Sequence, residues 1–104
     1  MPLSEVPLPA AQVMVPPRGR SLIREGLSRS RAIACFDFVP CNYEVFYRSL
    51  AALSPGTFCE WGSGMAIATG LAELLGFQAH GIELDEVLAA ASRQLLAEFG
   101  FQAT

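Results

Sequence analysis

Two closely spaced glycines, Gly62 and Gly64, constrain the fold of this chain more than any other feature. They follow a short apolar run, residues 57–59, whose side chains favour a buried strand. After them, apolar residues recur at helical spacing over residues 65–75. Glycine has no Cβ, so it adopts backbone angles closed to other residues and lets a ligand approach the main chain closely. This order predicts a strand, a glycine turn and a helix that packs on a sheet.

The next segment predicts a second strand and a second helix. Gly76 is placed to end the first helix, and residues 77–84 favour a strand around Gly81. Asp85 is a suitable N-cap for a helix over residues 86–99. The four elements therefore alternate between strand and helix, as in an α/β domain with a parallel sheet.

Two acidic residues frame the glycine turn. Glu60 stands just before it, and Glu83 ends the second predicted strand, 19 residues after Gly64. An acid in the second position can accept hydrogen bonds from both hydroxyls of an adenosine ribose, while the helix N-terminus beyond the glycines presents free N–H groups. A dinucleotide fingerprint would need a third glycine at position 67, where this chain has Ile67. The residues therefore point to an adenosine-containing ligand.

An alternative pattern, acidic-x-Gly-x-Gly-x-Gly, is met from Glu60 onwards, with Ala66 in place of the last glycine. In this respect the chain resembles the class I S-adenosylmethionine-dependent methyltransferases. In that family the first acid organises the loop and helps to hold the amino acid portion of the cofactor, and the second acid binds the ribose. The resemblance implies S-adenosyl-L-methionine as cofactor. By position, the implied cofactor-binding residues are Glu60, Gly62, Ser63, Gly64 and Glu83.

The resemblance covers residues 36–104 and implies the N-terminal, cofactor-binding half of such an enzyme. The expected fold is α/β: a Rossmann-like parallel sheet in a three-layer arrangement. We expect the sheet to be truncated after its second strand, or after a third strand that begins within residues 101–104. The later strand that contacts the methyl acceptor in this family is not supplied. The methyl acceptor, a protein or a small molecule, and the catalytic residues therefore stay unknown. We expect the isolated chain to be inactive, and to need a homo-oligomer or a C-terminal segment.

Two other classes of function remain open. One is a fragment of an NAD(P)- or FAD-binding oxidoreductase, and the other is a non-catalytic remnant or interaction module. A carboxylate beside the loop, such as Glu60, attracts the positive groups of a sulfonium cofactor and repels a pyrophosphate, which favours the methyltransferase interpretation.

Residues 1–34 differ in character from residues 35–104, which we assign to the methyltransferase-like domain. Five prolines among the first 17 residues predict a flexible or extended arm. The arm carries five arginines against two glutamates, a charge of +3, and the remainder carries two basic and eight acidic residues, a charge of −6. The arm contains no aromatic residue, so nucleic acid binding is not supported. In the domain, Asn42 is placed to cap a packing helix over residues 43–54.

Cysteine and histidine usage bounds the chemistry further. The three cysteines have no C-x-x-C spacing and His80 is the only histidine, so neither a metal site nor a disulfide framework is predicted. Free thiols fit a reducing cytoplasm. No secretory signal or membrane-spanning segment is recognisable, because the longest apolar stretch is short and broken by glycines.

Overall fold

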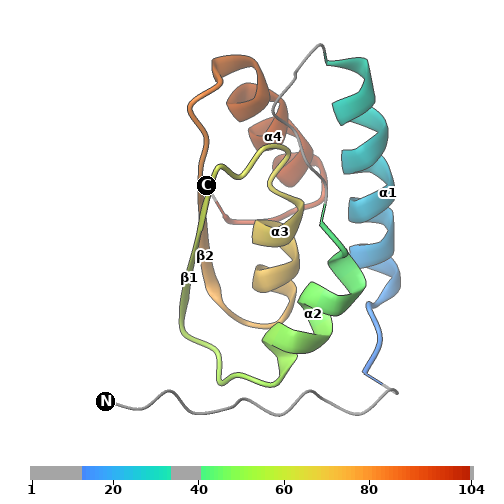
Figure 1. The fold of residues 1–104 in the computed structure, drawn as a ribbon, viewed down its shortest axis with the longest axis vertical. Helices are drawn as coiled ribbons and strands as arrows, with labels where there is room; N and C mark the ends of the chain where they lie inside the picture. Colours follow the sequence, from blue (N-terminus) through green and yellow to red (C-terminus); the bar gives the residue numbers. More distant parts are fainter. Residues whose placement is uncertain (1–12, 34–40, 104) are drawn as a thin grey trace.

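The computed structural model describes residues 13–33 and 41–103. This part of the chain forms a small mixed α/β domain of four helices and a two-stranded parallel sheet (Figure 1). In chain order the elements are α1 (Pro17–Ala32), α2 (Tyr43–Ala51), β1 (Thr57–Trp61), α3 (Ile67–Leu74), β2 (Gln78–Ile82) and α4 (Glu86–Glu98). The predicted alternation of strand and helix after residue 57 is confirmed.

The sheet pairs β1 with β2 in parallel, with Thr57 beside Gln78 and Trp61 beside Ile82 at the two ends of the register. Helix α3 connects the strands and packs on one face of the sheet. All four helices lie on this side of the sheet in Figure 1. Side chains on the opposite face are exposed. They belong to Thr57, Cys59, Trp61, Gln78, His80 and Ile82.

The predicted fold is thus confirmed only in its coarser features. The described residues supply one helical layer on one face of the sheet, not the expected three layers. No third strand forms over residues 101–103, because Phe101 turns its ring into the core, where it is 7% exposed. Thr104 lies outside the described residues.

Local sequence signals account for the helix ends. The Asn42 side chain accepts a hydrogen bond from the backbone N–H of Val45, and Asp85 Oδ1 accepts from the N–H groups of Val87 and Leu88. Both predicted N-caps are therefore confirmed. Gly76, which follows α3, has φ +92°, a left-handed conformation that favours glycine. Helix α2 ends at Ala51, three residues before the predicted end.

The flexible or extended arm predicted from the prolines is wrong for residues 17–32, which form helix α1. Pro17 occupies the first turn, where its missing N–H costs no hydrogen bond. Leu22 is fully buried, and a Cβ on Gly26 would lie 2.5 Å from the Ile67 side chain. A glycine at this position therefore lets α1 approach α3 closely. Residues 1–12 and 34 of the predicted arm lie outside the described residues.

The arginines of α1 fix this helix to the rest of the domain. Both Nε and Nη2 of Arg18 donate to the carbonyl oxygen of Phe99, and the Arg18 guanidinium lies 4.2 Å from the centre of the Phe101 ring. Arg29 pairs with Glu98 of α4 and with Glu25 of its own helix. Part of the positive charge of this segment is thus paired with acceptor groups of the acidic domain.

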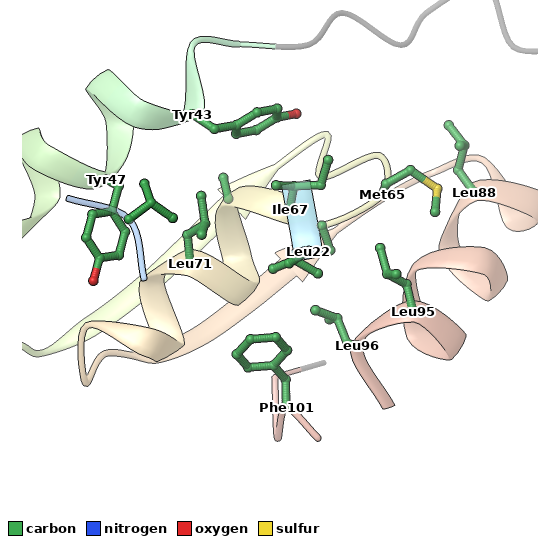
Figure 2. Close-up of a cluster of buried hydrophobic side chains, with 13 residues drawn as sticks. Leu22, Tyr43, Tyr47, Met65, Ile67, Leu71, Leu88, Leu95, Leu96 and Phe101 are labelled. Carbon is green, nitrogen blue, oxygen red and sulfur yellow. The ribbon is translucent and has the colours of Figure 1, made fainter. Parts of the chain in front are cut away.

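The main hydrophobic core lies between α1, α2, α3 and α4 (Figure 2). Its fully buried side chains include Leu22, Met65, Ile67, Leu71 and Leu95. Burying each such side chain contributes about 1.5–3 kcal/mol. A smaller cluster of Ala72, Phe77 and Ala79 lies between α3 and the sheet. None of the helices in the described ranges has both the length and the apolar character that crossing a membrane requires.

Candidate functional site

The loop between β1 and α3 has an alternating backbone. Gly62, Gly64 and Ala66 have φ of +68°, +55° and +61°, so every second residue is left-handed. An L-residue in this conformation costs about 1–2 kcal/mol, and Ala66 is the only non-glycine residue in the described part of the chain that adopts it. The third position of the acidic-x-Gly-x-Gly-x-Gly pattern is therefore left-handed like the two before it, although an alanine occupies it. The N–H of Ser63 donates to Ile82 O at 2.9 Å, which holds the loop against the end of β2.

Glu83 lies directly beside this loop. Its Oε1 accepts a hydrogen bond from the N–H of Gly64 at 2.7 Å, and its Oε2 accepts from the N–H of Asp85 at 2.9 Å. The carboxylate thus bridges the glycine loop and the start of α4. Each carboxylate oxygen has a second lone pair, so Glu83 can still accept hydrogen bonds from a ligand.

Glu60 lies near the end of β1 on the helix-covered side of the sheet and is partly buried. Its Oε1 accepts from the hydroxyl of Thr69 at 2.8 Å, and Thr69 itself is fully buried in α3. Burial raises the pKa of Glu60, the Thr69 bonds oppose this, and the charge of Glu83 adds to the increase. The two predicted carboxylates therefore act on one another from either side of the glycine loop.

Gly81 of β2 makes room for the loop. A Cβ at this position would lie 2.8 Å from Ser63 Cβ, 2.9 Å from Ser63 Oγ and 3.0 Å from Thr69 Oγ1. Between the loop, Gly81 and α4 there is a cavity of only about 50 Å³, lined by Ser63, Glu83 and Arg93 among others. This volume holds water but not a nucleoside. A ligand bound to Glu83 would therefore lie outside this cavity, on the solvent-exposed side of the loop.

Large exposed apolar side chains lie close to Glu83 along the chain or in the sheet, and those of Trp61 and Ile82 project from the helix-free face of the sheet. Trp61 is 81% exposed, Leu84 95% and Val87 62%, and Ile82, beside Trp61 in the sheet, is 42% exposed. Its exposure shows that Trp61 does not pack in the core of the described residues. Several exposed apolar residues near one site are a feature of binding surfaces.

The start of α2 also belongs to this region. Tyr43, which the sequence assigned to packing, is 9% exposed, and its ring lies over the side of α3 that carries Ile67 (Figure 2). Burial first, then the charges of Cys41 and Glu60, raise the pKa of Tyr43 to about 12. Burial and the charge of Glu60 likewise raise the pKa of the Cys41 thiol. Both residues therefore lie within the electrostatic range of Glu60.

The structure thus brings the five predicted site residues together at the carboxyl ends of two parallel strands. Sequence reasoning missed Thr69 and Gly81. A glycine inside a strand does signal a close backbone approach, so Gly81 was recognisable in principle, whereas Thr69 gave no signal. His80 lies on the exposed face of the sheet beside Cys59. Within residues 13–33 and 41–103, no three metal-ligating side chains are placed to hold a metal ion.

Comparison of the chain with protein-family models, with curated proteins and with solved structures finds no match.

Proposed function

We propose that this chain is the cofactor-binding part of a class I methyltransferase with a Rossmann-like domain, and that it binds S-adenosyl-L-methionine. The observation that carries the proposal is the loop of alternating left-handed residues, 62, 64 and 66, between the carboxylates of Glu60 and Glu83. The left-handed conformation of Ala66 adds weight, because an alanine would avoid this strain in an ordinary tight turn.

Each part of the site suits one part of this cofactor. Glu83, fixed beside the loop by Gly64, would accept hydrogen bonds from the ribose hydroxyls. The exposed side chain of Leu84, next to Glu83 in the chain, offers an apolar surface for the adenine ring. Glu60 would stabilise the positive charge of the amino acid portion, and a positive ligand would in turn favour the ionised form of this partly buried carboxyl.

When bound, the cofactor supplies a methyl group on a positively charged sulfur, and the acceptor atom bonds to the methyl carbon while the carbon–sulfur electron pair stays on sulfur. The protein contributes mainly by holding the two reactants in line. Glu60 and Glu83 would hold the two ends of the cofactor, one on each side of the glycine loop.

The dinucleotide alternative fits less well. Ile67, at the position of the third glycine of that fingerprint, is 1% exposed and packs in the core. The carboxylate of Glu60, beside the loop, would also repel the pyrophosphate of a dinucleotide.

Calorimetric titration with S-adenosylhomocysteine tests the proposal. Glu83→Gln should weaken binding by about 1.5–3 kcal/mol, or roughly 10- to 150-fold, because it removes a charged acceptor. Glu86→Gln is the matched control, since it makes the same charge change on an exposed residue of the first turn of α4. It should leave the affinity unchanged.

Other results would contradict the proposal in different ways. Equal affinity in Glu83→Gln and Glu86→Gln would remove Glu83 from the site. Tighter binding of NADH than of S-adenosylhomocysteine would favour the oxidoreductase alternative, and a folded chain that binds neither would favour a non-catalytic module.

A further inference from the structure

A larger cavity, of about 440 Å³, lies between α1 and the start of α2. From α1 it is lined by the charged side chains of Arg20 and Arg24 and by the apolar side chains of Ile23 and Leu27. Its volume falls in the range of pockets that bind small molecules, and its combination of an apolar wall with a few polar groups is typical of them.

The charge in this cavity is positive, although the chain as a whole carries a net charge of −3. Glu44 contributes the one carboxylate of the lining, and its Oε1 already pairs with Arg20 Nη1 at 3.1 Å. Arg24 contacts only the hydroxyl of Ser21, at 3.3 Å, and has no carboxylate partner among the described residues. Within residues 13–33 and 41–103, the exposed guanidinium of Arg24 is therefore not paired with a carboxylate.

The other polar groups of the lining are also donors. Asn42 uses its side-chain oxygen to cap α2, which leaves its amide N–H groups. Tyr43 keeps its phenolic proton at neutral pH, because burial, followed by the charges of Cys41 and Glu60, raises its pKa to about 12. A ligand that satisfies these groups must bring acceptor oxygens, and the arginine favours a negative charge on them.

The cavity also adjoins the proposed cofactor site. Cys41 and Tyr43 line it, and both lie within the electrostatic range of Glu60. Figure 2 shows the Tyr43 ring extending from the start of α2 towards α3, the helix that follows the glycine loop. If Glu60 holds the amino acid portion of the cofactor as proposed, a molecule in the cavity would lie on the same side as that portion.

We propose that this cavity binds a small organic acid, a carboxylate or phosphate monoester on an apolar body, and that an anionic oxygen of this acid is the methyl acceptor. The oxygen would bond to the methyl carbon as the carbon–sulfur bond breaks, the electron pair of that bond would stay on sulfur, and no proton would have to leave. Arg24 and the donors of Asn42 and Tyr43 bind the acidic group, and Ile23 and Leu27 contact the apolar body. Arg20 positions the site through Glu44. The acceptor role rests on the proposed function, whereas the binding of an acid does not.

Amide NMR titrations of the full chain test the proposal, with 2-naphthoate and 2-naphthyl phosphate as probes and neutral 2-naphthamide as the uncharged analogue. At least one acid should shift the amides of Arg24, Asn42 and Tyr43, and bind about tenfold more tightly than the amide. Arg24→Gln should lower that affinity about tenfold. Arg31→Gln, which removes the same charge from an exposed position of α1 outside the cavity, should not change it.

A second titration, with saturating S-adenosylhomocysteine, separates the two proposals. Simultaneous binding of acid and S-adenosylhomocysteine supports the acceptor role, whereas competition between them overturns it. Equal affinity for naphthamide and both acids, or an unchanged affinity in Arg24→Gln, overturns the acid site while leaving the cofactor site intact. Acid binding without any S-adenosylhomocysteine binding contradicts the proposed function and with it the acceptor role.

Discussion

Replacing Gly81 by alanine tests whether close contact between β2 and the glycine loop holds the candidate site together. The new Cβ would lie 2.8 Å from Ser63 Cβ and 3.0 Å from Thr69 Oγ1. Ser63 Cβ is fixed to the loop backbone, so no rotation of its side chain removes that contact. The loop or the strand must move instead, because Thr69 on the other side is fully buried and held by its hydrogen bond to Glu60.

The size of the effect follows from two opposing contributions. Overpacking of this kind costs about 1–3 kcal/mol. The lower entropy of the unfolded chain with alanine returns about 0.4–1 kcal/mol. The free energy of unfolding should therefore fall in Gly81→Ala, by about 1.3 kcal/mol at the midpoints of these two ranges. With a urea m value of about 1–1.5 kcal/mol/M, the midpoint of urea unfolding should fall by about 1 M.

Gly56→Ala provides the control for this measurement. Nothing lies within 4 Å of a Cβ at Gly56, and its φ is not positive. The urea midpoint of this variant should match or slightly exceed that of the parent chain. The midpoints are measured by far-UV circular dichroism. If Gly81→Ala unfolds at the same urea concentration as Gly56→Ala, the loop does not rest on β2 as described.

Three further perturbations test other parts of the structure. Leu22→Ala should lower the unfolding free energy by about 2–5 kcal/mol, because Leu22 is fully buried. Leu84 is 95% exposed, so Leu84→Ala should change the unfolding free energy by less than about 0.5 kcal/mol. Equal urea midpoints for the two variants would contradict the packing of α1. Asp85→Ala should cost about 0.5–2 kcal/mol through loss of the α4 cap, and an unchanged melting temperature would argue against that cap. The native Glu60 carboxyl keeps its proton to higher pH than the unfolded one, so the unfolding free energy should fall as pH rises from the ordinary pKa of 4.5 through the raised native value. Glu60→Gln, which can still accept from Thr69, should lack this decrease in urea titrations at several pH values, and an identical pH profile would refute the burial of Glu60.

Local signals in the sequence predicted much of this fold. The caps Asn42 and Asp85 and the stop at Gly76 act within a few residues of the chain, so their effect can be read from a short segment. The strand, turn and helix order around Gly62 and Gly64 was predictable for the same reason. The grouping of Glu60 and Glu83 followed from the rule that the carboxyl ends of parallel strands meet at one sheet edge.

Features that depend on tertiary packing were not predictable in this way. The prolines before residue 18 suggested an extended segment, but Pro17 is compatible with a first helical turn, and Leu22 stabilises α1 only because α3 lies against it. Thr69 lies nine residues after Glu60, and their hydrogen bond depends on how α3 crosses the strand. The exposure of Trp61 depends on which elements cover the sheet, which composition does not specify.

The most direct test of cofactor binding is a pair of two-dimensional amide NMR spectra of the full chain, recorded with and without S-adenosylhomocysteine. The proposed function predicts dispersed peaks and ligand-induced shifts concentrated at Gly62, Gly64 and Glu83, with the exposed face around Thr57 and Gln78 unchanged. Dispersed peaks that do not respond to S-adenosylhomocysteine would contradict it.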